Sequence, residues 1–158
     1  ALPISATVEE NIRLGLPGDI GTVLKMVCMD QDCATFPAGT QTPIGEGGQR
    51  LSGGQQARIA LARTLFHPRP LLILDDPFAA VDMATEQMIF DNLRRLGSDR
   101  IILLLSHRLS LFPKLDQVIW LNGDGTAVVS THEGLYASCP AYQDLYDLQH
   151  AQGGAIHE

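Results

Sequence analysis

The sequence contains very little lysine and no long apolar segment. Only two of its 158 residues are lysines, Lys25 and Lys114, and the formal net charge is −7. Because binding to nucleic acids or anionic membrane surfaces depends on clustered lysine and arginine, this balance argues against either as the main partner. The longest apolar runs, Leu71–Leu74 and Ile101–Leu105, are far shorter than the ~18 residues of a membrane-spanning helix. The composition therefore predicts a soluble globular domain without a transmembrane segment.

Cysteine is also scarce. Cys28, Cys33 and Cys139 are odd in number and lack the Cys-x-x-Cys spacing of metal ligands, which predicts reduced thiols in a cytosolic compartment. The N-terminal residues lack the basic region and apolar core of a secretory signal, so we expect no signal peptide.

The middle of the chain predicts an α/β fold with a parallel sheet. Leu71–Asp76 (LLILDD) is an apolar run closed by two acids, which is typical of a strand buried on both faces. A helix over Met83–Leu96 with Asp82 as its N-cap follows, and then a similar strand over Ile101–His107. Strand, helix and strand in this order indicate a right-handed crossover between parallel strands. The predicted inward stripe of the helix is Met88, Ile89, Leu93 and Leu96.

Shorter elements surround this unit. The spacing of apolar residues predicts an amphipathic helix from Ile20 with Asp19 as its N-cap. A hairpin of Gln117–Leu121 with Thr126–Ser130 and a terminal helix over Tyr142–His150 are expected near the C-terminus.

The segment Arg50–Leu65 (RLSGGQQARIALARTL) places a serine and two glycines at the start of a predicted helix, which runs from the Ser52 cap to about Phe66. The first turn of a helix has unsatisfied N–H groups and the positive end of the helix dipole. The segment is therefore a candidate anion site.

Polar side chains also end the two predicted strands. Asp75, Asp76 and His107 should converge at one sheet edge if their strands are neighbours. Two adjacent acids there suit a Mg²⁺–nucleotide site, in which one carboxylate steers the hydrated metal and the next polarises water. The alternative is that both acids only end the strand and cap a turn before Pro77, and that His107 is an ordinary histidine before a helix.

Taken together, LSGGQ (Leu51–Gln55), LLILDD, PFAAVD and LLLSHRLS resemble, in order and spacing, the nucleotide-binding domain of ABC transporters. The resemblance covers about Thr7 to Gln149. It implies an α/β fold: part of a P-loop NTPase core with a parallel sheet, plus a helical signature subdomain. The expected division is residues 1–65 for the helical subdomain with X-loop and signature, and 66–158 for the C-terminal part of the core.

The resemblance also implies roles for single residues. The signature residues Leu51, Ser52, Gly53, Gly54 and Gln55 would contact the γ-phosphate of an ATP held by a second, opposite domain. Asp75 matches the Walker B aspartate that orients Mg²⁺, and Asp76 matches the catalytic-base position after it. Asp82 closes the D-loop, and His107 matches the switch histidine that contacts the γ-phosphate. ATP and Mg²⁺ are the implied cofactors.

Further motifs resemble the exporter branch of this family. ATVEENIRLG, TPIGEGGQRLSGG and STHEGLY are exporter-like, and Glu46 matches the X-loop acid that faces the transmembrane domains; the alternative for Glu46 is a solvated loop acid. The implied partners are a second nucleotide-binding domain and transmembrane domains, at the cytoplasmic face of the cell membrane, with no nucleic acid. Two alternatives remain: a non-transport ABC ATPase of chromosome maintenance or DNA repair, and a non-catalytic interaction fragment.

Two departures from the family pattern qualify these roles. Neither lysine follows a glycine, so the Gly-x-x-x-x-Gly-Lys-Ser/Thr loop that holds phosphates is missing from this sequence. We therefore expect a C-terminal piece of a longer transporter, inactive alone, rather than a naturally short protein. The family's hydrolytic sites generally have glutamate where Asp76 stands, which predicts a slow, degenerate site of an asymmetric transporter.

Overall fold

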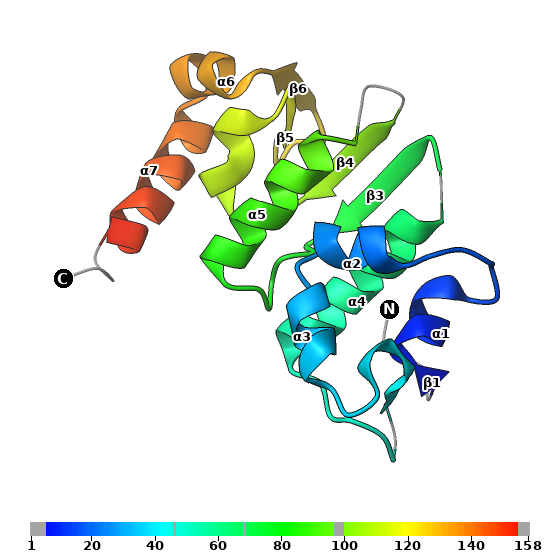
Figure 1. The fold of residues 1–158 in the computed structure, drawn as a ribbon. Helices are drawn as coiled ribbons and strands as arrows, with labels where there is room; N and C mark the ends of the chain where they lie inside the picture. Colours follow the sequence, from blue (N-terminus) through cyan, green and yellow to red (C-terminus); the bar gives the residue numbers. More distant parts are fainter. Residues whose placement is uncertain (1–5, 46, 68, 97–99, 155–158) are drawn as a thin grey trace. The chain divides into compact units, whose positions relative to one another are not determined.

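The structure is a computed structural model that describes residues 6–45, 47–67, 69–96 and 100–154. The chain forms two compact units, Ala1–Ser106 and His107–Glu158, and each is described by itself. The boundary predicted between residues 65 and 66 falls inside the first unit and stays a prediction. Figure 1 labels the α-helices and most of the strands. The elements of the first unit are β1 (Ala6–Thr7), α1 (Val8–Arg13), α2 (Gly21–Met26), α3 (Asp30–Thr35), η1 (Gly39–Gln41), β2 (Pro43–Ile44), α4 (Gly53–Phe66), β3 (Leu71–Asp75), α5 (Met83–Arg94) and β4 (Ile101–Leu105).

The two long strands form the predicted parallel pair. β3 lies beside β4 in a register that joins Leu71 to Ile101 and Asp75 to Leu105. This confirms the strand–helix–strand unit that the sequence predicts, with α5 as the connection. The parallel pairing brings the carboxyl ends of both strands to the same edge, where Asp75 lies.

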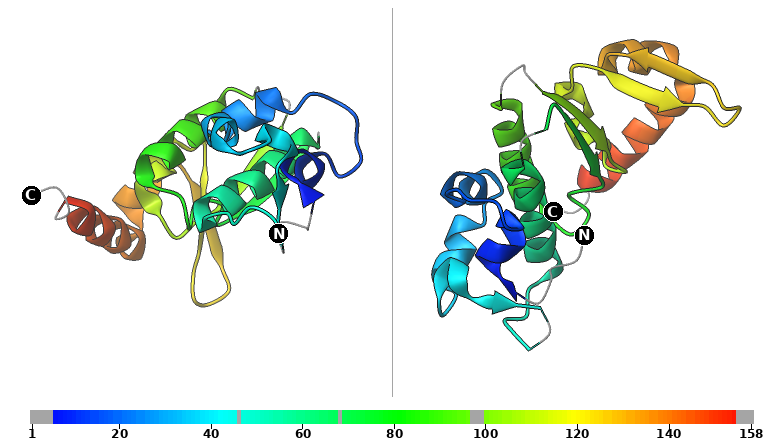
Figure 2. Two further views of the ribbon diagram at one scale, coloured as in Figure 1. Left: turned by 60° about the horizontal axis from the view of Figure 1, so that its bottom comes forward. Right: turned by 90° about the vertical axis from the view of Figure 1, so that its right-hand side faces the viewer.

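The prediction that these strands are buried on both faces is wrong. Leu72 and Leu74 are 3% and 5% exposed, whereas Ile73 between them is 60% exposed. Figure 2 shows α4 and α5 on one side of the β3–β4 pair. Side chains on the other face of the pair are exposed. The exposed side chains of this uncovered face are Leu71, Ile73, Ile101, Leu103 and Leu105.

The helix α5 begins as predicted but is rotated slightly from the expected orientation. Asp82 is its N-cap, and its side chain accepts a hydrogen bond from Thr85 N at 2.9 Å. Ile89 and Leu93 are buried as predicted, but Met88 is 50% exposed, so its place in the inward stripe is wrong. The buried positions are Glu86, Ile89, Phe90 and Leu93, which follow the i, i+3, i+4, i+7 spacing of one helix face.

The predicted capping role of Asp19 is also wrong. The helix α2 begins one residue later than expected, so its N-cap is Ile20. The side chain of Ile20 makes no capping hydrogen bond. Asp19 Oδ1 instead accepts a hydrogen bond from Gly21 N at 3.0 Å. The short helix α3, which the sequence analysis did not predict, follows directly and also lacks a side-chain cap.

A buried asparagine joins α1 to α4. Asn11 is fully buried, and Arg63 of α4 donates to its carbonyl oxygen through Nε at 2.6 Å and to its Oδ1 through Nη2 at 2.9 Å. Asn11 Nδ2 in turn donates to Thr7 O at 3.0 Å. Burial lowers the pKa of Arg63, but its guanidinium remains charged at physiological pH. The Asn11–Arg63 contact therefore gives hydrogen-bond partners to polar groups of both residues, which would otherwise be buried at a cost in stability.

The second unit contains η2 (Leu109–Lys114), β5 (Val118–Leu121), β6 (Ala127–Ser130), α6 (His132–Ser138) and α7 (Pro140–Gly154). The antiparallel β5–β6 pairing confirms the predicted hairpin, and α7 contains the predicted terminal helix. The core is built on Tyr142, which is fully buried, with its hydroxyl 2.7 Å from His132 Nδ1. Burial raises the pKa of Tyr142 to about 12. Within the described residues, no helix has the length and apolar character needed to cross a membrane.

We predict that Asn11→Ala lowers the free energy of unfolding by about 2 kcal/mol, because it leaves Arg63 Nη2 without the Asn11 Oδ1 acceptor at a partly buried contact. Urea denaturation of both variants measures the change. Gln31→Ala, at an exposed position of α3, is the control and should shift the value by less than about 0.5 kcal/mol. Equal effects of the two substitutions would contradict a stabilising role for Asn11.

Candidate functional site

The α4 entry turn (Leu51–Gln55) has the geometry of a helix start held by its own side chains. Ser52 is the N-cap, and its Oγ accepts a hydrogen bond from Gln55 N at 3.2 Å. Gln55 Oε1 accepts one from Ser52 N at 3.0 Å, which completes a capping box. The predicted cap is confirmed. Gly53 N and Gly54 N belong to the four N–H groups that a helix start leaves without an intrahelical partner.

The two glycines of the entry turn lie against the Ala79–Asp82 segment. A Cβ on Gly54 would lie 2.7 Å from the main-chain oxygen of Ala80, which is closer than real Cβ contacts allow. A Cβ on Gly53 would lie 3.4 Å from Ala80 Cβ, an ordinary contact. The close approach of Ala80 thus requires glycine at position 54. Position 53 has room for a Cβ, so a larger residue such as alanine fits there.

A second set of contacts to the entry turn was missed by the sequence analysis. Gln55 Nε2 donates to Asp32 Oδ1 at 2.8 Å, and Arg58 Nη1 donates to Asp32 Oδ2 at 2.9 Å. Arg58 also donates to Gly54 O at 3.3 Å and to Cys28 O. Asp32 lies on α3, 23 residues before Gln55, so no local pattern indicates this pairing.

The two acids that end β3 differ in backbone conformation. Asp75 is the last residue of β3 and is exposed on the same side of the strand as Ile73. Asp76 has φ of 43°, in the left-handed region that aspartate adopts more readily than most residues, and its N–H donates to Leu105 O at 2.8 Å. Both acids therefore lie where β3 and β4 end together.

The arrangement at Asp75 fits a Mg²⁺ ion bound together with a nucleotide. Within the described residues, no group of three or more His, Cys, Asp or Glu side chains could hold a metal ion by itself. Mg²⁺ usually keeps several waters and takes one or two carboxylates plus phosphate oxygens. An exposed carboxylate at a sheet edge can supply one such ligand.

His107 opens the second unit. Its carbonyl oxygen accepts a hydrogen bond from Gln149 Nε2 at 2.7 Å, and Gln149 Oε1 accepts one from Leu109 N at 2.9 Å. α7 thus fixes the main chain around His107. The predicted convergence of His107 with Asp75 and Asp76 involves two separate units and stays a prediction.

The structure describes two of the three remaining predicted residues, Asp82 and Leu51, but not Glu46. Hydrogen bonds from Thr85, first of all from its backbone N–H, hold the pKa of Asp82 below its ordinary value of 3.8. The side chain of Asp82 is thus engaged as the cap of α5, which does not test its predicted role in nucleotide binding. Leu51 is 8% exposed and anchors the entry turn in the core. Glu46 lies outside the described residues.

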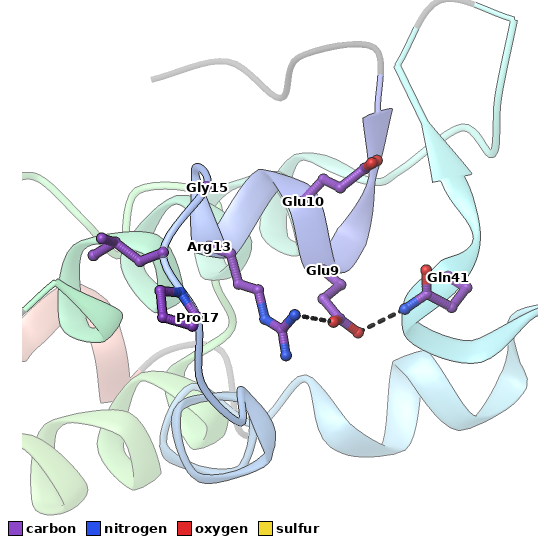
Figure 3. Close-up of a pocket in the computed structure, with 7 residues that line it drawn as sticks. Glu9, Glu10, Arg13, Gly15, Pro17 and Gln41 are labelled. Atoms are coloured by element: carbon purple, nitrogen blue, oxygen red, sulfur yellow. Dashed lines mark hydrogen bonds and ion pairs between the residues drawn. The ribbon is translucent and has the colours of Figure 1, made fainter.

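Two hollows of the first unit are lined by none of the predicted site residues. One, of about 320 Å³, is lined by Glu9, Glu10, Arg13, Gly15, Leu16, Pro17 and Gln41. Figure 3 shows that Glu9, one of its two acids, is already paired: Glu9 forms an ion pair with Arg13 at 2.7 Å and accepts a hydrogen bond from Gln41 Nε2 at 2.7 Å. The other hollow, of about 600 Å³, is formed by residues between Pro37 and Arg50. Ser52 and Asp75 lie instead on open surface.

Comparisons with known proteins agree on one family. A family model described as "ABC transporter" matches residues 3–79. A protein of Staphylococcus aureus (strain NCTC 8325 / PS 47), named as a multidrug export ATP-binding/permease protein, is 36% identical over 149 residues, which is 92% of this chain and 26% of that protein. The protein of the same name in strain COL gives the same figures.

A solved structure described as a bacterial Atm1-family ABC exporter with ATP bound is similar in fold. It has a TM-score of 0.86 and 30% identity, over 94% of this chain and 27% of that one. The chain thus spans about a quarter of the length of the relatives that it matches.

The glycine contacts yield a matched pair of substitutions. We predict that Gly54→Ala lowers the free energy of unfolding by about 1–3 kcal/mol, because the new methyl group collides with the main chain at Ala80. Gly53→Ala should be neutral or stabilising by up to about 1 kcal/mol, since alanine favours helices over glycine. Urea denaturation measures both. Similar stabilities of the two variants would contradict the close approach of Ala80 to Gly54.

Proposed function

Because this chain belongs to the ABC transporter family, with exporter ATP-binding proteins among its relatives, we propose that its α4 entry turn closes over an ATP held by a second nucleotide-binding domain. The observation that carries this proposal is the start of α4, where the exposed Ser52 cap is followed by the exposed Gly53 and by Gly54. Closure of the two domains is transmitted to transmembrane domains, with the ATPase at the cytoplasmic face of the cell membrane. The multidrug-export names of the relatives favour this function over chromosome maintenance or DNA repair.

The entry turn offers the γ-phosphate three donors. Ser52 Oγ accepts from Gln55 N, which leaves its own hydroxyl hydrogen available to a phosphate oxygen. The N–H groups of Gly53 and Gly54 add two more at the positive end of the α4 dipole. The absence of a Cβ at Gly54 instead accommodates the main chain of Ala80, which lies against this side of the turn.

The carboxyl end of β3 would supply two of the groups for hydrolysis, and His107, which follows β4, a third. Asp75 would hold Mg²⁺ through its exposed carboxylate, and Asp76 would orient the attacking water. His107 would contact the γ-phosphate. Mg²⁺, when bound, neutralises charge that develops on the phosphate oxygens.

We further propose that the site with Asp76 is the slow site of an asymmetric transporter. The aspartate carboxylate lies one methylene closer to the backbone than a glutamate would place it, and a displacement of about 1 Å can cost roughly 100-fold in rate. The left-handed backbone at Asp76 supports aspartate as the residue adapted to this turn. The entry turn of the same chain would then serve the faster site, whose phosphates the partner domain holds.

The proposal predicts that the isolated chain binds ATP weakly, with Kd above about 1 mM, because it supplies donors to a phosphate but no phosphate loop. Equilibrium binding of a fluorescent ATP analogue, with and without Mg²⁺, measures this. Micromolar binding by the monomeric chain would overturn the view that the entry turn acts on a nucleotide held elsewhere.

In the transporter that carries this chain, Asp76→Glu should raise ATP turnover by roughly 10- to 100-fold, since it extends the base towards the water. Phosphate release by purified transporter in vesicles is the measurement. Asp144→Glu, the same change at an exposed position of α7, is the control. Unchanged turnover in Asp76→Glu would rule out a degenerate site at this position.

A further inference from the structure

The side-chain amide of Gln55 makes two hydrogen bonds, one through its oxygen and one through its nitrogen. Its Oε1 closes the capping box with Ser52 N, and its Nε2 donates to Asp32 Oδ1 at 2.8 Å. An amide has one acceptor end and one donor end, so the position of Asp32 fixes which end faces Ser52. Asp32 therefore selects the amide orientation that supports the cap.

Arg58 holds Asp32 in this place. The Arg58 guanidinium lies one helical turn after Gly54 and contacts Asp32 Oδ2 at 2.9 Å, Gly54 O at 3.3 Å, and Cys28 O. The two side chains are partly buried, at 14% exposure for Arg58 and 25% for Asp32. A partly buried ion pair keeps its geometry better than a pair of fully exposed side chains.

The local charge balance is acidic without Arg58. Burial raises the pKa of the Cys28 thiol; Arg58 lowers it, and Asp30, Asp82 and Asp32 raise it further. Three acids and this arginine are thus close enough to act on the same group. The Asp32 carboxylate contacts Gln55 of the entry turn, so an anion that approached the turn would meet the field of this acid unless Arg58 balanced it.

We propose that Asp32 and Arg58 are positioning residues of the α4 entry turn: Asp32 orients the Gln55 amide, and Arg58 cancels the negative charge that Asp32 would otherwise place beside a bound phosphate. This inference rests on the proposed function, because it assigns these residues to the phosphate contact made by Ser52, Gly53 and Gly54. Neither side chain touches the nucleotide. They act through Gln55 and through the charge at the start of α4.

The test separates charge from fold. In the intact transporter, Arg58→Met should raise the ATP concentration at half-maximal hydrolysis about tenfold, with little change in kcat, because it leaves Asp32 uncompensated. Asp32→Asn keeps an oxygen for Gln55 and loses the charge, so the double variant Asp32→Asn/Arg58→Met should return to within about threefold of wild type. Raising the salt concentration from about 0.05 M to about 0.5 M should reduce the Arg58→Met defect.

Matched controls make each outcome decisive. Asp30→Asn removes the same charge from α3, two residues from Asp32 and outside the Asp32–Gln55–Arg58 network, and should rescue Arg58→Met less than Asp32→Asn does. If Arg58→Met lowers kcat and thermal stability together, and the double variant is no better, the pair is only structural and the inference is overturned. Ser52→Ala tests the proposed function separately: if it leaves hydrolysis unchanged, the phosphate contact itself fails. If Ser52→Ala impairs hydrolysis and the charge rescue is absent, only the positioning role fails.

Discussion

The reciprocal hydrogen bonds between Ser52 and Gln55 fix where α4 begins, and the rest of the first unit depends on that start. Each residue of a helix is turned by about 100° from the one before it, so a start one residue earlier or later would turn every α4 side chain away from its partner. The observed start places Gly54 against Ala80 and Arg63 against Asn11. A short local motif thereby sets the contacts of α4 with α1 and with the segment after β3.

Features determined by neighbouring residues could be predicted from the sequence. The Ser52 cap, the Asp82 cap and the β5–β6 hairpin each depend on side chains a few positions apart. The β3–β4 pairing could be predicted because apolar strands separated by a helix have few alternatives. The order of the motifs identified the family, which the comparisons confirm.

Features that depend on distant residues could not be predicted in the same way. The contact of Arg63 with Asn11 joins residues 52 positions apart, and that of Arg58 with Asp32 joins residues 26 positions apart. Neither arginine differs in its local pattern from a solvated helix residue. The exposed position of Met88 has the same origin, because which apolar residue faces inward depends on the elements that α5 packs against. The roles of Asp75, Asp76 and His107 remain predictions from motif position.

The uncovered face of β3 and β4 bears on the fate of the protein in the cell. Five aliphatic side chains lie exposed on two adjacent strands, ending beside the Asp75 carboxylate. Such surface promotes aggregation of incompletely assembled chains, and chaperones and proteases continuously sort such chains. A copy of the chain in which this face stays open is therefore expected to aggregate more readily than one in which the face is covered.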